Sequence, residues 1–381
     1  PACVAIVLFV LDELGYDKYN TKADRIYRID TEARFGENYY KITQRSAPEA
    51  RAMIEEFPEV ESAVRFRNYG PYLVRAVDSN ETFKEHRVIW TDSTFFSIFS
   101  VNVLEGNPAT ALTEPASIAI SKKIADKYFP GKRALEQSMI LNNKHTVKVT
   151  AVYEDLPAAS HFHFDILISM AGSWSVAREA QSTSFVSENF TTYLLLKEKA
   201  NAEALENKFP KFIEKHLGPE YAKEFGNDFT MEKFRASGNQ YTITLRPLTD
   251  IHLHSDLAGE FEANGNLTYV YMLSTIAGFI LIIACINFMN LSTARSSTRA
   301  KEVGVRKVMG SLRSHLVGQF LTESVLLTFF SFTLAIGLVY MLLPMFNEFF
   351  LKNIQLPLTS PLFYLLVFTM ATVIGMVSGI Y

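Results

Sequence analysis

Hydrophobic and polar residues follow two different patterns along this chain. From Asp12 to about Thr268 short alternating runs and amphipathic stretches succeed one another, as in a globular domain. After that point no charged residue occurs from Ala263 to Ala294, and 316–346 is apolar apart from Glu323 and a few hydroxyl or amide groups. Both runs are long enough for helices that cross the ~30 Å hydrocarbon core of a bilayer. The pattern predicts membrane helices at 269–294 and 316–346.

Apolar runs also stand at both ends of the sequence. Residues 1–11 would cover roughly half of a bilayer core at ~1.5 Å per residue, so we expect them to be the outer part of a first transmembrane helix. Residues 362–381 are uncharged and apolar, as in an incomplete fourth transmembrane helix. The chain is therefore expected to be a fragment of a longer protein.

The globular region 12–268 mixes strands and helices. The helix expected after Ser46 has capping-box spacing to Glu49, and Asn142-Asn143 predicts a hairpin turn. The pattern gives an α+β domain in two subdomains, with the second inserted at about 165–240. The expected strands are 25–31, 60–67, 72–77, 83–90, 117–120, 139–141, 146–152, 164–169, 191–196 and 241–245, and the other expected helices are 95–99, 121–129 and 202–217.

The distribution of charged residues then predicts which segments lie on which side of the membrane. The segment 295–315 carries six Lys or Arg residues against Glu302 alone, in a chain of formal net charge -3, so the remainder is acidic. Short loops rich in Lys and Arg stay in the cytoplasm, which places 12–268 outside it. The fold class expected is a membrane α-helical bundle plus an extracytoplasmic α+β domain. The acidic remainder argues against a nucleic-acid partner.

The basic segment is amphipathic if helical. Val305, Val308, Met309 and Leu312 fall on one side, and positions 299, 302 and 306 on another. Glycines 304 and 310 indicate a bend, a close backbone approach, or a helix end at Gly310. Two interpretations stay open: a solvated loop whose charges set topology and attract anionic membrane lipid, and a docking surface for a cytoplasmic partner.

Other residues could carry chemistry. His161 with His163, and His252 with His254, have the spacing that puts two imidazoles on one face of a strand, where they could bind zinc. Neither pair lies in a known metalloprotease pattern, and we expect no metal site. The acids Glu154, Asp155 and Asp165 fit strand-end surface positions better than a catalytic pair. Cys3 and Cys285 both lie in apolar runs and predict no disulfide.

Three polar residues fall within the predicted membrane helices. Glu323 is expected either at the interface, paired with a basic residue, or in gating. Asn287 and Asn290 are expected to join helices through hydrogen bonds.

The run from Ile282 to Gly310, with Gln319-Phe-Leu-Thr-Glu-Ser324, strongly resembles the FtsX-like permease domain of MacB-type ABC transporters. Five further stretches are similar to the MacB-like periplasmic core domain of those permeases, and they are 12–20, 23–28, 153–157, 160–165 and 250–255. The resemblance covers essentially the whole chain and is most specific at 282–324.

This resemblance implies a permease subunit of an ABC transporter in the bacterial cytoplasmic (inner) membrane. A cytoplasmic ABC ATPase would bind ATP, and its motion would move the extracytoplasmic domain, a mechanism called mechanotransmission that drives export. The chain has no phosphate-binding loop, so ATP is expected only in the partner and no cofactor or catalysis in this chain. A dimeric or pseudo-dimeric permease and a periplasmic partner are also implied. The ATPase contacts implied are Arg299, Lys301, Glu302, Gly304, Arg306, Lys307 and Gly310.

Two alternatives belong to other classes. One is an FtsX-like regulatory module that controls a cell-wall hydrolase without transport. The other is a membrane-anchored metal hydrolase that uses the histidine pairs.

Overall fold

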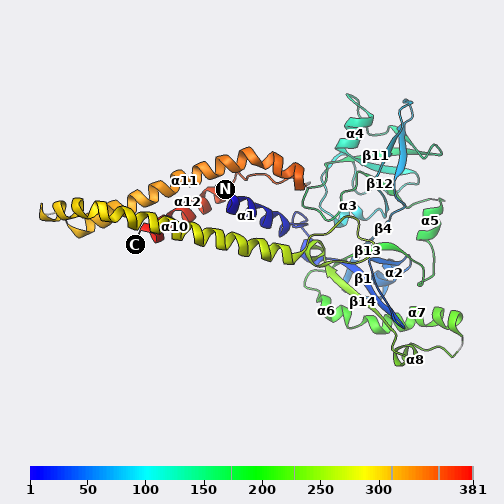
Figure 1. The fold of residues 1–381 in the computed structure, drawn as a ribbon. Coiled ribbons are helices and arrows are strands. Elements are labelled where there is room, and N and C mark those ends of the chain that lie inside the picture. Colours follow the sequence, from blue (N-terminus) through cyan, green and yellow to red (C-terminus); the bar gives the residue numbers. More distant parts are fainter. Residues whose placement is uncertain (173, 227, 310–311, 351, 380–381) are drawn as a thin grey trace. The chain divides into compact units, whose positions relative to one another are not determined.

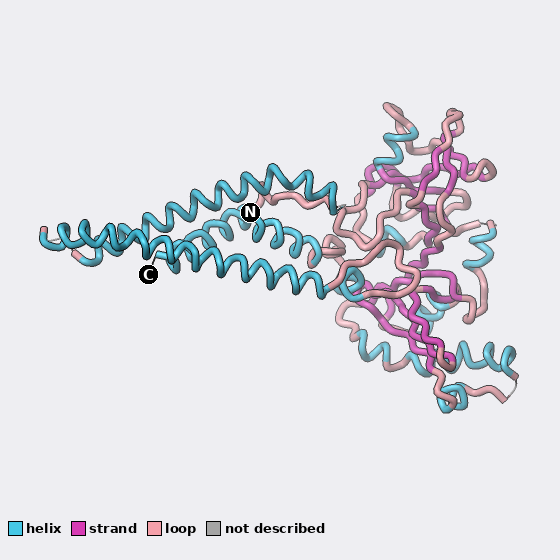
Figure 2. The backbone as a smooth tube through the Cα atoms, in the orientation of Figure 1, coloured by secondary structure: helices cyan, strands magenta, loops and turns pink. Residues whose placement is uncertain are grey.

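The chain forms two compact units. The computed structural model describes residues 1–172, 174–226, 228–309, 312–350 and 352–379 (Figure 1). One unit, here called the helical unit, contains Pro1–Gly15 and Asn266–Tyr381, and the other, the α+β domain, is Tyr16–Gly265. Figure 2 shows that the first is built of helices and the second around strands. The α+β domain is thus a single insertion between two helices of the helical unit.

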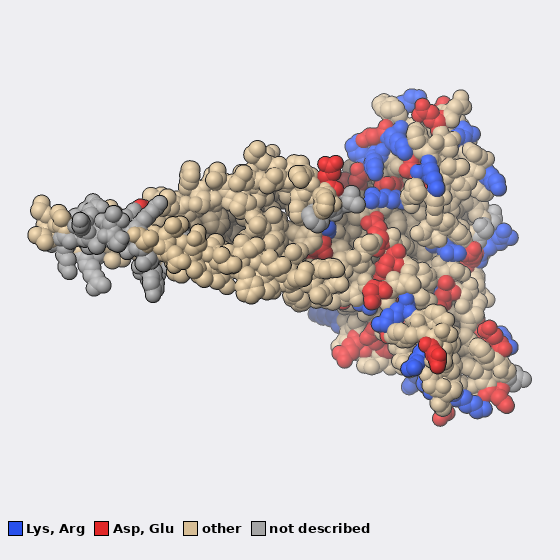
Figure 3. All heavy atoms as spheres, viewed as in Figure 1, with Lys and Arg blue, Asp and Glu red and all other residues tan. Residues whose placement is uncertain are grey.

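The helical unit consists of long, apolar helices. Among the described residues, two helices are long and apolar enough to cross a membrane, at Leu267–Leu291 and Val317–Phe349, and Pro361–Met376 is apolar but shorter. In Figure 3 the atoms of these helices that are not drawn grey include few charged groups, whereas Lys, Arg, Asp and Glu are frequent on the α+β domain. The helices are α1 (Ala2–Glu13), α10 (Leu267–Val308), α11 (Arg313–Phe350) and α12 (Pro361–Gly379).

Two contacts hold the helical unit together. A Cβ on Gly375 of α12 would lie 2.8 Å from the Cα of Val325 on α11, so the two helices approach each other as closely as a glycine allows. After α11, Lys352 Nζ lies 3.0 Å from Asp12 Oδ2 and 2.5 Å from Glu13 Oε1 at the end of α1. The glycine contact therefore joins the consecutive helices α11 and α12, and the partly buried ion pairs join the segment after α11 to α1.

The α+β domain is organised on one 14-stranded mixed sheet. Its strand order is β14-β1-β13-β4-β7-β12-β9-β11-β10-β5-β6, with β2 paired to β1, β3 to β13 and β8 to β11. The strands are β1 (Ile26–Phe35), β2 (Asn38–Ile42), β3 (Gln44–Ser46), β4 (Val60–Arg67), β5 (Tyr72–Ala76), β6 (Phe83–Glu85), β7 (Val88–Thr91), β8 (Val103–Gly106), β9 (Ser117–Ser121), β10 (Ser138–Leu141), β11 (His145–Tyr153), β12 (Ile166–Ser169), β13 (Glu188–Leu196) and β14 (Gln240–Pro247).

Short helices cover this sheet. They are α2 (Glu49–Glu56), α3 (Phe95–Ile98), α4 (Lys122–Tyr128), α5 (Ser175–Ala180), α6 (Ala202–Glu206), α7 (Phe209–Phe225), α8 (Met231–Ala236) and α9 (Ile251–His254), with 3-10 turns at Ala23–Arg25 and Leu248–Asp250. The stretch 165–240 contributes β12 and β13 to the interior of the same sheet as the strands before it, and α5 to α8.

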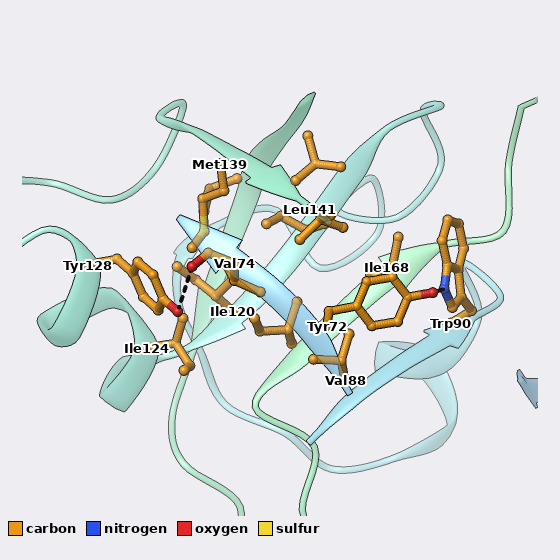
Figure 4. Packing of buried hydrophobic residues seen from close by; sticks show 14 of the residues in the cluster. Tyr72, Val74, Val88, Trp90, Ile120, Ile124, Tyr128, Met139, Leu141 and Ile168 are labelled. Carbon is orange, nitrogen blue, oxygen red and sulfur yellow. Dashed lines mark hydrogen bonds between the residues drawn. The ribbon is translucent and has the colours of Figure 1, made fainter. Parts of the chain in front are cut away.

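Three hydrophobic cores lie against the sheet. In the first, which surrounds β5, β9 and β10, Trp90 Nε1 donates to Tyr72 Oη at 2.8 Å and Tyr128 Oη donates to the carbonyl of Val74 (Figure 4). The second joins α2, α6 and α7 to β1, β4 and β14. The third is rich in phenylalanine and includes Phe66 and Phe162. Apolar residues on both faces explain why several central strands are buried at every position.

Three local predictions are wrong. The run 83–90 is two strands, because the carbonyl of Arg87 accepts hydrogen bonds from Asp165 and Ile166. Glu49 does not cap α2, because its carboxylate binds the guanidinium of Arg45 at 2.7 Å instead. The helix expected at 202–217 breaks between α6 and α7.

The hairpin turn at Asn142-Asn143 is confirmed. Both residues have positive φ, at 50° and 56°, and connect β10 to β11. Asparagine tolerates this left-handed conformation better than most residues.

Candidate functional site

The basic segment lies at the end of one uninterrupted helix. α10 runs from Leu267 to Val308, which at 1.5 Å per residue is about 63 Å. Its apolar part, Leu267–Leu291, accounts for about 37 Å. Residues 292–308 therefore prolong the helix by about 25 Å beyond the apolar part, and the helix does not end at Gly304.

The residues expected to contact an ATPase fall on this extension. The structure describes only the backbone of positions 299, 301, 302, 304, 306 and 307, which all lie in α10, while Gly310 lies outside the described residues. The apolar side chains beside them are described: Val305, Val308, Met309 and Leu312 are between 63% and 90% exposed. These four large apolar side chains lie at the end of α10 and in the residues that follow it.

The intramembrane polar residues lie on two helices. Glu323 is half-buried on α11, one residue before the buried Ser324. Asn287 and Asn290 on α10 are exposed, and neither forms a hydrogen bond with another described residue. Their expected roles stay predictions.

The histidine pairs do not lie on strands, which corrects the geometry assumed for them. His252 and His254 are in the short helix α9, where residues two apart do not share a face. His252 stacks on Tyr16 and His254 Nδ1 contacts Asp250 Oδ1 at 2.5 Å. Among the described residues, no group of three metal-ligating side chains comes together.

Two of the three acids considered for catalysis contact Lys123, and Glu154 instead accepts from Asn102 Nδ2 at 3.2 Å. Asp155 Oδ1 accepts the backbone N–H of Lys123 at 3.1 Å, and Asp165 Oδ2 lies 3.8 Å from Lys123 Nζ. Burial raises the pKa of Asp165, and the nearby positive charges of Lys123 and Arg87 oppose this rise. These contacts fit the stabilisation of the start of α4.

The first histidine pair belongs to a loop that joins both chain connections of the α+β domain. We call residues 157–164 the junction loop. The incoming connection, 16–20, is held to it by the N–H of Asp17, which donates to the carbonyl of Ala159 at 2.8 Å. Asp17 Oδ2 also lies 2.9 Å from His161 Nδ1, outside hydrogen-bond geometry, and both side chains are almost fully buried.

Two tyrosines also contact the junction loop next to the incoming connection. His161 Nε2 is 2.7 Å from Tyr193 Oη on β13, and Tyr19 Oη is 3.1 Å from Ser160 Oγ. Burial raises the pKa of Tyr19 to about 12 and raises that of Tyr193 as well, so both phenols stay protonated. The incoming connection is therefore fixed to the sheet by buried polar contacts.

The outgoing connection, residues 256–265, is held to the same loop. Glu262 Oε2 contacts His163 Nδ1 at 2.9 Å, and the His163 ring also contacts the carbonyl of Pro157 at 2.9 Å. Phe261 packs edge-on against Phe164, with ring centroids 5.0 Å apart. Burial raises the pKa of Glu262, but the hydrogen bonds to His163 and the positive charges of His163 and Arg87 together lower it more, so its pKa lies below the ordinary value.

A buried ion network fixes the outgoing connection to β1. The side chain of Arg28 is fully buried, and it contacts Asp30 Oδ1 and Glu260 Oε2, each at 2.6 Å. Arg28 Nη2 also donates to Ser255 Oγ at 2.7 Å, and Arg246 contacts the other oxygen of Asp30 at 2.7 Å. A buried charge is stable only when paired in this way.

The backbone of the outgoing connection adds further contacts. Ala258 exchanges hydrogen bonds with Lys41 and Thr43, and Gly259, at φ 90°, lies so close to Gln44 that a Cβ would clash with its amide. Both connections therefore meet one loop and one sheet, and the outgoing one continues directly into α10.

Sequence reasoning missed the acids of this junction. Asp17, Glu260 and Glu262 look like ordinary surface acids in the sequence, and their partners are 144, 232 and 99 positions away. The H-x-H spacing drew attention to these histidines as possible zinc ligands, which were not expected to form a metal site, but it did not indicate the contacts of His161 and His163 with two separate carboxylates.

Comparisons with known proteins agree with this architecture. The model of the MacB-like periplasmic core domain matches residues 2–212, and that of the FtsX-like permease C-terminal domain matches residues 274–381. The first match alone covers more than half of the chain. The chain therefore belongs to the MacB/FtsX type of ABC transporter permease.

Individual relatives match over short segments. The chain is 36% identical over 69 residues to the uncharacterized ABC transporter permease YknZ of Bacillus subtilis, which is 18% of this chain and 17% of that protein. It is 36% identical over 75 residues to the macrolide export ATP-binding/permease protein MacB of a Shewanella species, or 20% and 12% of the two chains. The matches thus span less than a fifth of these two relatives' length.

Solved structures resemble the chain more distantly. A domain of a putative permease from Porphyromonas gingivalis has a TM-score of 0.49 at 23% identity, covering 60% of this chain and 91% of that one. The periplasmic region of MacB from Actinobacillus actinomycetemcomitans has a TM-score of 0.39 at 11% identity, covering 58% and 89%.

Proposed function

We propose that this chain is the membrane subunit through which a cytoplasmic ABC ATPase moves an extracytoplasmic domain, and that this motion drives export. The chain itself carries no catalytic step in this proposal. ATP binding and hydrolysis take place in the partner, whether that partner is a separate subunit or a fused domain.

The continuity of α10 carries the proposal. One helix joins the apolar span at Leu267–Leu291 to the basic extension at 292–308. A continuous helix resists bending over tens of ångströms, so a displacement at one end is passed to the other. At its other end α10 is preceded by the connection that Glu260 and Glu262 fix to the sheet.

The composition of the extension supports docking to a protein. Exposed Val305 and Val308 on the extension, with Met309 and Leu312 just after it, supply an apolar contact, and the five basic residues of 292–308 supply charge. A partner groove with an apolar floor and acidic rim would match both features.

The proposed placement follows from charge and length. The basic extension lies in the cytoplasm, α10 and α11 cross the inner membrane, and the α+β domain lies outside. α1 and α12 complete a membrane bundle, and the permease acts as a dimer or pseudo-dimer.

Charge reversal at the extension tests the proposal. In the full-length protein, with its ATPase, Arg306→Glu/Lys307→Glu should abolish copurification of the ATPase or its stimulation by the permease. The matched control, Lys122→Glu/Lys123→Glu, reverses two lysines of α4 in the α+β domain and should change neither. Unchanged association and stimulation in the first variant would contradict the docking role.

A further inference from the structure

One edge of the large sheet is open along part of its length. β14 is the last strand at that edge and pairs only with β1, in the register Arg34↔Gln240 to Tyr27↔Pro247. In Figure 1 it lies near α6, with α7 and α8 beyond it. An edge strand presents unpaired backbone groups to any strand that can reach them.

A groove runs along this edge. Its volume is about 710 Å³, and its lining includes the consecutive strand residues 240–244, the start of α7 at Phe209 and Pro210, and Arg34 and Arg235. Because consecutive residues of a strand point to opposite faces, their joint presence means that the groove follows the strand's edge rather than one of its faces.

The backbone in the groove is available for pairing. The N–H of Leu245 contacts Glu206 Oε1 and so points away from β1. Residues two apart in an antiparallel strand direct their N–H and C=O to the same side, so Tyr241 and Ile243 direct theirs into the groove. No hydrogen bond from either backbone N–H to another described residue is present. Glu206 thus closes one end of the edge and leaves 240–244 open.

The charge of the groove is positive. Arg34 and Arg235 are exposed, and neither forms an ion pair with a described residue. Arg34 Nε donates only to the carbonyl of Gly36, at 3.2 Å. The remaining charged residue of the lining is Glu206, whose Oε1 accepts the backbone N–H of Leu245. Two free guanidinium groups beside an open strand edge favour a ligand with carboxylates.

We propose that this groove binds an extended, acidic peptide segment of another extracytoplasmic protein, which adds as a strand to β14. The backbone of Tyr241 and Ile243 would supply the ladder hydrogen bonds, and Arg34 and Arg235 would select carboxylate side chains. The site lies apart from the junction loop and does not depend on the function proposed for α10.

Fluorescence anisotropy with defined peptides tests this site on the full-length chain in detergent micelles. The probe is a fluorescein-labelled nine-residue peptide that alternates threonine with glutamate. Two matched peptides replace every glutamate by lysine, or every threonine by proline, which cannot donate to a ladder. We expect saturable binding of the glutamate peptide and much weaker binding of the other two.

The charge-reversed variant Arg34→Glu/Arg235→Glu provides the second arm. Two exposed charge pairs are together worth about tenfold in affinity, so the glutamate peptide should bind about tenfold more weakly and the lysine peptide should now bind better. Since both arginines are exposed, the fold should persist, and an unchanged unfolding midpoint from tryptophan fluorescence confirms it.

Three results would overturn the proposal. They are the absence of saturable binding by the glutamate peptide, equal affinity for all three peptides, and equal affinity of the two protein variants. A dimer of the wild-type chain that dissociates in the charge-reversed variant, measured by analytical ultracentrifugation, would also overturn it, since a second copy would then occupy the groove.

Discussion

Removing the carboxylate of Glu260 should weaken the α+β domain measurably. Glu260 contacts the buried Arg28 through two hydrogen bonds, at 2.6 and 2.9 Å, and also accepts from Ser255. Its side chain is only 13% exposed. In Glu260→Ala the guanidinium of Arg28 keeps Asp30, which lies at 2.6 Å, but loses its second anion.

The expected loss of stability depends on Asp30, which remains as the partner of Arg28. Breaking a buried ion pair costs about 3–5 kcal/mol when it leaves a charge without compensation. Because Asp30 still compensates Arg28, we expect a loss of about 2–3 kcal/mol in the free energy of unfolding. For a domain of this size that loss would lower the melting temperature by about 4–12 °C.

Tryptophan fluorescence measures this loss in the intact chain. Its two tryptophans, Trp90 and Trp174, both lie in the α+β domain, so urea unfolding in detergent micelles reports on that domain alone. The control is Glu55→Ala, which removes an exposed partner of Arg51 and should cost no more than about 0.5 kcal/mol. A loss of unfolding free energy for Glu260→Ala no larger than that of the control would contradict a stabilising role of Glu260 in the buried ion network.

The same variant gives a pH test. Burial raises the pKa of Glu260, but the hydrogen bonds and charge of Arg28 lower it more, so the folded pKa lies below the ordinary value. A depressed carboxyl pKa stabilises the fold above the unfolded pKa of about 4.3, and that stability is lost as pH falls through the folded pKa. The difference between wild type and Glu260→Ala should therefore be full at pH 7 and shrink below about pH 4. A difference that grows in acid would show that another group is responsible.

Three further substitutions test particular contacts. Gly375→Leu should force α12 away from Val325, because the leucine overpacks this contact at a cost of about 1–3 kcal/mol. The detergent-solubilised chain should then aggregate at a lower temperature. An unchanged aggregation temperature would argue against this close approach. Asn143→Val should destabilise the α+β domain by about 1–2 kcal/mol in the tryptophan assay, because Asn143 has φ 56°, whereas Asn143→Gly should not. Lys352→Met leaves Asp12 and Glu13 without this lysine and should lower the same aggregation temperature, and additional Asp12→Asn/Glu13→Gln changes should restore part of the loss.

Local patterning predicted much of the fold. The strand expected at 60–67 has the bounds of β4, and 25–31 lies almost wholly in β1. Both could be predicted because the alternation of apolar and polar residues along a strand is a local property of the sequence. The division at 83–90 could not be predicted, since it depends on hydrogen bonds from Asp165 and Ile166, some eighty residues away. Glu49 shows the same limit, because its partner Arg45 is buried only once the sheet has formed.

The basic segment 295–315 and the junction loop also differ in how far the sequence predicted them. Counting charges identified the segment 295–315, because hydropathy and the distribution of Lys and Arg are local properties of the sequence. That α10 passes Gly304 without a break was not predicted, since the two glycines left a bend or a close backbone approach open. The junction loop was not predicted at all, because its meaning depends on which acids fold onto His161 and His163.

The most direct test of the central claim is a flexible insertion into α10. Four glycines inserted after Leu291 should leave ATPase association intact but uncouple the two ends of the helix. Hydrogen exchange at residues 256–265 is then compared with and without a non-hydrolysable ATP analogue, in full-length protein with its ATPase in nanodiscs. We expect a nucleotide-dependent change in wild type that is lost in the insertion variant. The same nucleotide-dependent change in both proteins would contradict it.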